Sequence, residues 1–522
     1  MANIRIGKNV IETLTSGMYE DARFVYREYV QNSADQIDKA VELGVLQNRQ
    51  AGSIHIRIDY VNREIIIEDN ATGIESDRVY SVLGNIALSE KDRTKNKGFR
   101  GIGRLGGLGY CDQLIFETSY QGEDIKTEMI WDAKSLQSQL NNHNLHIDAV
   151  ELVESVIILK KSQIEKDKHF FKITMKNVNN SDLLNDKLIE EYLSIVAPVT
   201  FPSHFILKHK IYDKMRKMNM TIDEYNIYIN TNQLSKPYSN AIYERFKKNG
   251  KKKIDEVFDV EFFDFFYKDE FLAWGWFGLS KLLKQIPNCV DLNINPARGI
   301  RLRKGNIQIG SERTLEKFHK EPRGNFYFIG EIYAIHPDLI PNSRRDYFNE
   351  NEICKVLNKK VKTLFYTKLY SLYYDANAVK NALKKIHSVH QLKKEIEEKE
   401  SSTGFTDKNE QNKLYEQLKR SKDEAIKGIK TLNKLEEKSK SDNSFKKIYN
   451  RYKDDIDNTK LTIEIKGINP EIEQKTVYRT NKLSRLTKKD QKFLSKVFSI
   501  IDIVLTPELA ENLKIKLEEE FK

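Results

Sequence analysis

The stretch Arg27-Glu28-Tyr29-Val30-Gln31-Asn32-Ser33-Ala34-Asp35 stands inside residues 19–44, a run with the pattern of one amphipathic helix. Glu28, Asn32 and Asp35 are spaced i, i+4 and i+7, so they share one helical face. The apolar residues Val25, Tyr29, Ile37 and Val41 fall mostly on another stripe. The polar face is either solvated, as most charged helix faces are, or buried, in which case its charges need partners. A metal–nucleotide complex would supply such partners.

Composition limits the class of protein. The chain has 522 residues, enough for about three domains. Its net charge is +11, with basic residues spread along the chain, which is weak support for a nucleic-acid reader. Cys111, Cys289 and Cys354 lie far apart without CxxC spacing, which argues against a disulfide framework or a zinc site. The N-terminus lacks a signal-peptide core and no apolar run is long enough to cross a bilayer, so we expect a cytoplasmic protein with no membrane partner.

Two β-strands joined by a turn at Asn62-Arg63 are predicted after the helix. The second strand ends in Asp69-Asn70-Ala71-Thr72-Gly73. This segment is either an ordinary strand-to-helix corner or part of a binding site. In the second case the Asp69 carboxylate would accept from an exocyclic amino group such as adenine presents, and Gly73 would leave room for a flat ring.

A glycine-rich segment, residues 88–109, precedes the next predicted strand. Its first half is polar and lysine-rich, as expected of a mobile lid. Its glycines are Gly98, Gly101, Gly103, Gly106, Gly107 and Gly109. Their backbone N–H groups, with Arg100 and Arg104 and the dipole of a following helix, would form an anion cradle. The alternative is a flexible linker, but apolar residues between the glycines favour a packed loop.

Three motifs therefore occur in one order: E-x-x-x-N-x-x-D on a helix, D-x-x-x-G after a strand, and a glycine lid before a strand. Together they resemble the GHKL ATPase superfamily of gyrase B, histidine kinases, MutL and HtpG-type heat-shock chaperones. Residues 14–39 are most similar to the N-terminal helix pair of the HtpG-type chaperones. The resemblance implies a Bergerat-fold α/β sandwich, with ATP and Mg²⁺ as ligands.

The resemblance also implies a role for each motif residue. Glu28 would be the general base that polarises the attacking water, and Asn32 would hold Mg²⁺ together with the phosphates. Asp35 would approach the adenine side, and Asp69 would accept from the adenine amino group. Gly73 would border the adenine, and the triphosphate would be lined by Gly101, Gly103, Gly106, Gly107 and Gly109.

The sequence departs from the family pattern in three places. Ala71 stands where the second motif usually has glycine, which narrows the pocket. The run Gly106-Gly107-Leu108-Gly109 is one residue longer than in the chaperones, so the register of its last glycine is open. The family expects a threonine on a later strand, but Phe171 stands at the matching position and Thr174 is out of register. The threonine contact is therefore unassigned.

Two basic residues of the middle region are candidates for the γ-phosphate. Lys304, in IRLRKGNIQIG, lies between strands, where MutL-like and MORC-like proteins present a lysine. Arg345, in DLIPNSRRDYF, matches the chaperone segment whose arginine reaches the nucleotide. The alternative for each residue is a charged side chain on the protein surface with no role in nucleotide binding. The aromatic residues between Phe262 and Trp276 are expected in a core.

From about residue 376 the chain changes to charge-laced helices with apolar residues near heptad spacing. Leu414, Leu418, Ile426, Ile429 and Leu432 predict a narrow apolar stripe, so we expect a helical hairpin or a short coiled coil. This arm would either mediate dimerisation or partner binding, or brace the second domain.

The predicted fold class is α+β. The predicted domains are a GHKL ATP-binding domain in residues 1–180, a ribosomal-S5-like middle domain in residues 181–375, and a helical C-terminal region in residues 376–522. The expected function is an ATP-hydrolysing, HSP90-like conformational clamp that acts on a protein client and forms an ATP-dependent homodimer. The alternative is a MORC- or MutL-like ATPase clamp on DNA.

Overall fold

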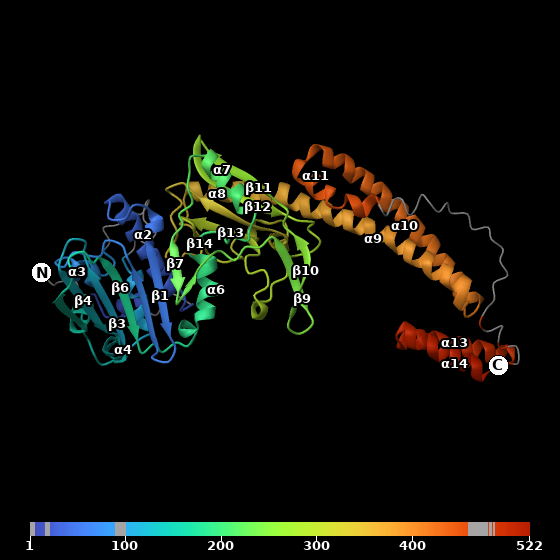
Figure 1. Cartoon of the computed structure of the whole chain (residues 1–522), viewed down its shortest axis with the longest axis horizontal. Helices are drawn as coiled ribbons and strands as arrows, with labels where there is room; N and C mark the ends of the chain where they lie inside the picture. Colours follow the sequence, from blue (N-terminus) through green and yellow to red (C-terminus); the bar gives the residue numbers. More distant parts are fainter. Residues whose placement is uncertain are drawn as a thin grey trace. The chain divides into compact units, whose positions relative to one another are not determined.

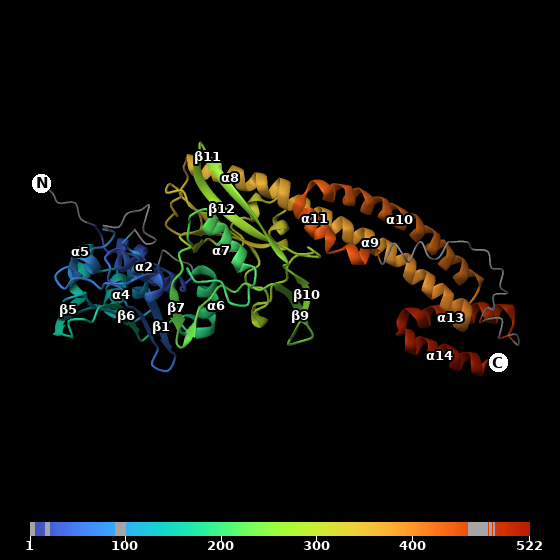
Figure 2. The same ribbon diagram turned by 45° about the horizontal axis from the view of Figure 1, so that its top comes forward.

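The structure is a computed structural model that describes residues 6–15, 21–88, 101–457, 479, 483 and 486–521. It divides into two compact units (Figure 1, Figure 2). Unit 1 comprises Met1–Ser280 and Lys284–Tyr370, and unit 2 comprises Lys281–Leu283 and Ser371–Lys522. The predicted boundary between residues 180 and 181 lies inside unit 1 and stays a prediction.

Unit 1 begins with an eight-stranded sheet in the order β5-β4-β3-β6-β2-β1-β7-β8. Its pairings are antiparallel except for β1 with β7, which is parallel. The strands are β1 (Ser53–Asp59), β2 (Glu64–Asp69), β3 (Gln113–Ser119), β4 (Ile125–Asp132), β5 (Ile157–Gln163), β6 (Phe170–Lys176), β7 (Asn226–Ile229) and β8 (Asn232–Gln233). The predicted hairpin turn between β1 and β2 is present, with Arg63 in the left-handed region at φ 50°.

The alternation of side chains decides which face of this sheet is covered. On β1 and β2, Ile54, Ile56, Ile65 and Ile67 are buried and belong to one hydrophobic core. That core includes α2 (Phe24–Glu42), which packs on both strands. His55 points to the opposite face because successive strand residues alternate in direction. Residues on one side of the sheet therefore meet α2, and those on the other side do not.

The remaining helices of this region are short. They are α1 (Asn9–Thr15), α3 (Val79–Gly84), α4 (Ala133–Asn141), α5 (Ala149–Ser155), α6 (Asp186–Val196) and α7 (Lys208–Lys217). The sequence also predicts a short helix over residues 8–20, of which residues 16–20 lie outside the described residues. After Ile102 the glycine segment forms a 3-10 helix, η2 (Gly103–Gly109), and the chain then enters β3. The α-helix expected to follow the glycines is therefore not found there.

A second sheet in unit 1 has five strands in the order β11-β12-β15-β13-β14, and a separate two-stranded sheet joins β9 and β10. The strands are β9 (Ala241–Phe246), β10 (Gly250–Glu256), β11 (Asp259–Tyr267), β12 (Glu270–Leu279), β13 (Gly299–Lys304), β14 (Ile307–Ile309) and β15 (Ile329–Ala334). Trp274 and Trp276 are fully buried, and Trp276 packs with Phe201, Phe205 and Tyr238. The aromatic run is mostly core as expected, although Phe266 is 51% exposed.

A group of buried charges lies within this second sheet. The Glu331 carboxylate accepts from Lys236 Nζ at 2.9 Å and also from Arg303 Nε and the Tyr333 hydroxyl. Arg303 Nη2 donates to Ile195 O, in the last turn of α6, at 2.9 Å. Burial alone would raise the pKa of Glu331, but the charges of Arg303 and Lys236 outweigh it and hold that pKa at about 2. The carboxylate is therefore ionised and satisfied.

Unit 2 contains the long helices α9 (Tyr370–Glu398) and α10 (Lys408–Ser441), and it follows α8 (Glu352–Leu364) of unit 1 through a π-helical turn. Helices α9 and α10 are antiparallel, since Lys385 pairs with Glu424 at 2.6 Å and Lys438 with Asp375 at 2.6 Å. The expected helical hairpin is present (Figure 1). The prediction for Ile426 is wrong, because its side chain is 51% exposed while Ala425 and Gly428 are buried. Gly428 faces Ala382, whose carbonyl oxygen would lie 3.1 Å from an added Cβ.

Unit 2 ends with α11 (Asn443–Asn450), α13 (Lys488–Val504) and α14 (Pro507–Glu520). Among the helices that the structure describes, none combines the length and the apolarity needed to cross a bilayer. Cys111, Cys289 and Cys354 are free thiols.

Candidate functional site

The polar face of α2 is buried rather than solvated. Glu28 is 7% exposed and Asp35 is 4% exposed, and Asn32 is half-buried. Burying carboxylates on a helix is costly unless each has a partner. The solvated alternative for this face is therefore excluded, and its buried side chains require polar partners.

Gln31 adds a second polar group on the same helix. Its side chain is 1% exposed, and its amide nitrogen and oxygen are buried without a hydrogen-bond partner in the part of the chain that is described. Gln31 lies three residues from Glu28 and four from Asp35, so it is a neighbour of both on the helix surface. Leaving a buried amide without a hydrogen-bond partner lowers the stability of a fold by about 1–3 kcal/mol. This cost favours a site in which a polar ligand or water supplies the missing partner.

Glu28 lies where three distant segments of unit 1 meet. Its Oε1 accepts from Arg345 Nε at 3.0 Å, and both side chains are buried. On the other side lies Gly103 of η2, where an added Cβ would stand 2.2 Å from Glu28 Oε2. We call Glu28, Gly103 and Arg345 the Glu28 cluster. Only glycine leaves room for the carboxylate at position 103.

Arg345 is held in this position by a closed turn. Its φ of 54° places it in the left-handed region, and its carbonyl oxygen accepts from Gly310 N at 2.8 Å. Asn342 N donates to Tyr347 O at 2.9 Å, and Pro341 and Phe348 form a β-bridge that closes the turn. The turn therefore directs the guanidinium to Glu28.

The second cation candidate, Lys304, has other partners. It ends β13, between the strands as predicted, and its Nζ donates to Ile335 O at 3.2 Å and His336 O at 2.7 Å. Burial lowers the pKa of Lys304 to about 8, against the opposing charge of Asp338. The structure thus brings Arg345, and not Lys304, onto Glu28.

Tyr29 fixes the glycine segment to α2. Its buried hydroxyl accepts from Gly107 N at 3.1 Å and donates to Arg104 O at 3.1 Å. An added Cβ at Gly107 would stand 2.5 Å from that hydroxyl. Burial raises the pKa of Tyr29, so the phenol stays protonated and can donate. The sequence analysis assigned Tyr29 to the apolar stripe and missed this role.

The other residues of the segment have mixed roles. Gly101 has a φ of 70°, Gly106 would place a Cβ 3.6 Å from Val25, and Gly109 ends η2. Arg104 Nε donates to Leu83 O at 3.2 Å, at the end of α3, and burial lowers the pKa of Arg104 to about 10. The segment is packed as expected, since Leu105 and Leu108 are buried. Gly98 and Arg100 lie outside the described residues.

Asp69 ends β2 on the sheet face that α2 covers. It is 2% exposed, and its Oδ1 accepts from Ala71 N at 3.1 Å. It pairs with Phe171 on β6, which in turn pairs with Thr118 on β3. Asp69, Phe171 and Thr118 therefore form one row across three strands.

Thr118 is a residue that sequence reasoning missed. Its hydroxyl accepts from Ile74 N at 2.9 Å and donates to Phe170 O at 2.9 Å, so it ties the turn after Asp69 to the sheet. Thr174 pairs with Ile66 and Ile115, three residues along β6 from Phe171 and on the opposite face. Only the strand register, which the sequence does not show, places Thr118 in the same row as Asp69.

The backbone geometry at position 73 itself requires glycine. Its φ is 70°, and an added Cβ would stand 2.0 Å from Ser119 O and 3.0 Å from Phe170 O. The close approach to β3 and β6 therefore requires glycine here, whatever ligand lies nearby. Ala71 is fully buried, so the departure from glycine is absorbed in the core.

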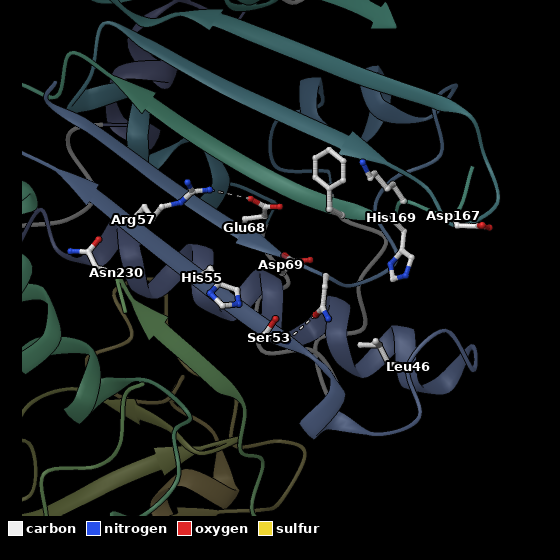
Figure 3. A pocket seen from close by; sticks show the side chains of 12 residues that line it. Leu46, Ser53, His55, Arg57, Glu68, Asp69, Asp167, His169 and Asn230 are labelled. Atoms are coloured by element: carbon white, nitrogen blue, oxygen red, sulfur yellow. Dashed lines mark hydrogen bonds and ion pairs between the residues drawn. The ribbon is translucent and has the colours of Figure 1, made fainter. Parts of the chain in front are cut away.

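A cavity of about 630 Å³ lies on the other face of the sheet (Figure 3). His55, Arg57 and Glu68 line it, and Arg57 pairs with Glu68 at 3.8 Å. These side chains alternate with the buried isoleucines that face α2. Asp69 borders the cavity only where β2 ends, so this cavity is separate from the Glu28 cluster.

Comparison with known proteins agrees with the predicted family and fold class. Residues 19–169 match the family of histidine kinase-, DNA gyrase B-, and HSP90-like ATPases. The chaperone protein HtpG of Buchnera aphidicola subsp. Acyrthosiphon pisum (strain APS) is 24% identical over 177 residues. That alignment covers 30% of this chain and 28% of the relative.

Residues 19–169 are therefore an ATPase domain of the GHKL superfamily, as the three motifs predicted. The similarity to HtpG agrees with membership of that superfamily. The matched residues include Glu28, Asp69 and the glycines of η2. Arg345 and Lys304 lie outside them, so the contact of Arg345 with Glu28 rests on the structure.

Proposed function

We propose that this protein binds ATP with Mg²⁺ and hydrolyses it at the Glu28 cluster, as the chemical step of a conformational clamp. The observation that carries the proposal is the buried pair between Glu28 and Arg345, which are 317 residues apart in the chain. Glu28 comes from the matched ATPase domain and Arg345 from the turn after the second sheet. A cation supplied by a second domain couples the arrangement of the domains to the nucleotide.

The two charged residues would have complementary roles in turnover. Glu28 polarises the attacking water and accepts its proton, and Arg345 stabilises the charge that develops on the transferred phosphoryl group. Without nucleotide the Arg345 guanidinium donates to the Glu28 carboxylate, so that oxygen is not available to a water molecule. The phosphates of ATP compete for Arg345, and this competition releases Glu28 for catalysis.

The rest of the site would hold the substrate. Asp69 accepts from the adenine amino group, with Asp35 on the adenine side. The triphosphate would lie along Gly101, Gly103, Gly106, Gly107 and Gly109, where the missing side chains let the backbone approach. Tyr29 supports this function because it anchors that backbone to α2.

The residues present fit a magnesium ion that is held mainly by the nucleotide. Among the described residues there is no group of three or more His, Cys, Asp or Glu side chains able to hold a metal. Magnesium often takes one or two protein ligands and completes its shell with phosphates and water. The half-buried amide of Asn32, one turn from Glu28, is the ligand we assign. The ion would neutralise phosphate charge.

The target of the clamp is the second part of the proposal. Similarity to a protein named as a chaperone favours a protein client, with an ATP-dependent homodimer as the working form. The net charge of +11 favours the alternative, a clamp on DNA.

Phosphate release from ATP by the purified full chain tests the proposal. We expect release in Mg²⁺ and its loss when EDTA is added, with recovery on adding excess Mg²⁺. A chain that binds ATP in Mg²⁺ but releases no phosphate above a no-protein control would contradict the assignment of turnover.

A further inference from the structure

The hairpin formed by β9 and β10 carries a concentration of positive charge. Its tip, residues 245–253, reads RFKKNGKKK, in which six of nine residues are basic and none is acidic. The expectation of evenly spread basic residues is wrong here. We call residues 245–253 the basic tip.

The hairpin is a defined structure and not a loose loop. Its strands pair from Ala241 with Glu256 to Phe246 with Gly250, with one shift of register between Lys253 and Asp255. Asn295 holds its base, since its Oδ1 accepts from Tyr243 N at 3.1 Å and its Nδ2 donates to Tyr243 O at 2.7 Å. Figures 1 and 2 both show the hairpin of β9 and β10 extending beyond the five-stranded sheet. The base is fixed, so the tip is presented outward.

Most of the charge at the tip is not neutralised. Arg245 pairs with Asp291 and Lys253 pairs with Glu256. Among the described residues no carboxylate pairs with the other four lysines, Lys247, Lys248, Lys251 and Lys252, and all four are exposed. Holding these charges together is unfavourable, and an external polyanion would relieve the repulsion.

Aromatic rings lie among these lysines. Phe246 is 48% exposed, and Lys247 Nζ lies 5.4 Å from the centre of its ring. Lys251 Nζ lies 4.9 Å from the ring of Tyr243. The Phe246 side chain is thus only partly covered by the rest of the protein. It provides an apolar surface beside the charges, and apolar side chains can contact base edges in the major groove.

We propose that the basic tip binds the phosphate backbone of duplex DNA. A two-stranded ribbon is narrow enough to enter the major groove. Lysines act as point charges toward phosphate oxygens and do not need the fixed geometry that an arginine fork gives a carboxylate. Because the unpaired cations are all lysines, they fit a closely spaced phosphate chain better than the discrete carboxylates of an acidic protein.

Binding of a fluorescently labelled DNA duplex, measured by anisotropy over a range of NaCl concentrations without nucleotide, tests this proposal. The variant replaces Lys247, Lys248, Lys251 and Lys252 by Gln, and we expect it to bind at least about 10-fold more weakly at low salt. Each phosphate contact contributes about −0.9 to the slope of log K against log salt, so the slope should become shallower by about 3 to 4. The exposed positions should leave folding unchanged.

A matched variant replaces four exposed lysines away from the hairpin, Lys160, Lys161, Lys359 and Lys360, by Gln. It lowers the net charge by the same amount as the first variant. It should bind DNA almost as the wild type does. Equal losses of DNA affinity in the two variants would overturn the proposal. A wild-type chain that does not bind DNA would also overturn it, and is the result expected if the tip binds an acidic protein. Because nucleotide is absent, the result does not depend on ATP hydrolysis.

Discussion

Among individual residues, Glu28 has the most closely determined surroundings. The Arg345 guanidinium contacts one of its oxygens, and Gly103 leaves room for the other. These two contacts hold the carboxylate in a defined position, which is what a general base requires.

Replacing Arg345 by Ala should lower the rate of ATP hydrolysis at least about 100-fold, because a preorganised cation at the developing charge is worth that much or more. ATP affinity should change little, since the adenine side is untouched. Lys304→Ala is the matched variant, and it should retain turnover because Lys304 donates to backbone carbonyls. Turnover that survives loss of Arg345 but not of Lys304 would reverse the assignment.

Replacing Asp69 by Asn should weaken ATP binding at least about 10-fold, since a hydrogen bond to a charged group contributes about 1.5–3 kcal/mol. The amide can still accept from Ala71 N, so the turn should be preserved. Isothermal titration with ATP measures the effect. Glu68→Gln, on the opposite face of the same strand, is the control. Unchanged affinity in Asp69→Asn would show that adenine is recognised elsewhere.

The placement of Glu28, Asn32 and Asp35 on one face of a helix was predictable from the sequence alone, because helical spacing is a local property. Arg345 was predictable from its neighbours, but its contact with Glu28 was not. Tyr29 and Thr118 were missed because their hydroxyls act across distant segments. Gln31 could have been predicted as a site residue from one feature of the sequence, an amide close to two acids on the same helix.

Among elements, the pairing of α2 with η2 determines the site. The glycine segment is a 3-10 helix held on α2 by the Tyr29 hydroxyl, so the carboxylate of Glu28 and the backbone of η2 are placed together. Sequence predicted a packed glycine loop but not its helical form, because glycine has little intrinsic helical preference and tertiary contacts decide.

Replacing Gly103 by Ala should lower turnover at least about 10-fold, because the new Cβ would stand 2.2 Å from Glu28 Oε2 and displace either the carboxylate or η2. Circular dichroism should show an intact fold. Gly84→Ala, at the end of α3 with nothing within 4 Å of the added Cβ, is the control. Normal turnover in Gly103→Ala would mean that the contact is not part of the active arrangement.

The helices of unit 2 show a second limit of sequence reasoning. Heptad spacing predicted the hairpin of α9 and α10 but placed Ile426 in its seam. The seam instead uses Ala425 and Gly428, because Gly428 lets α10 approach the backbone of α9. Small residues at a close helix contact carry no hydrophobic signal, so a pattern of large apolar residues cannot find them.

Across the whole molecule, the segments of unit 1 interlock. The first sheet is completed by β7 and β8, which follow α6 in the chain, and Arg303 of the second sheet donates to the last turn of α6. Glu331 ties Arg303 to Lys236. These links run from the second sheet to α6, and sequence patterns could not show them.

Replacing Glu331 by Gln should destabilise the fold by about 3–5 kcal/mol, because it leaves two buried cations without their anion. In the wild type the pKa of Glu331 lies below its ordinary value of 4.5, at about 2. Its contribution to stability is therefore complete above pH 4.5 and is lost as the pH falls toward 2. Urea denaturation at several pH values measures both effects.

The control for this experiment is Glu424→Gln, which removes an exposed partner of Lys385 and should leave the unfolding midpoint unchanged. A wild-type stability that does not decline between pH 4.5 and pH 2, or an unchanged midpoint in Glu331→Gln, would contradict the assigned role of the buried carboxylate.

The rate of ATP hydrolysis by Glu28→Gln, measured at nucleotide concentrations that saturate both this variant and the wild type, tests the central claim most directly. The amide can still accept from Arg345, so the buried contact is kept while the base is removed. We expect ATP to bind normally and turnover to fall by at least about 100-fold. A variant that hydrolyses ATP at the wild-type rate would show that the Glu28 cluster is not the catalytic site.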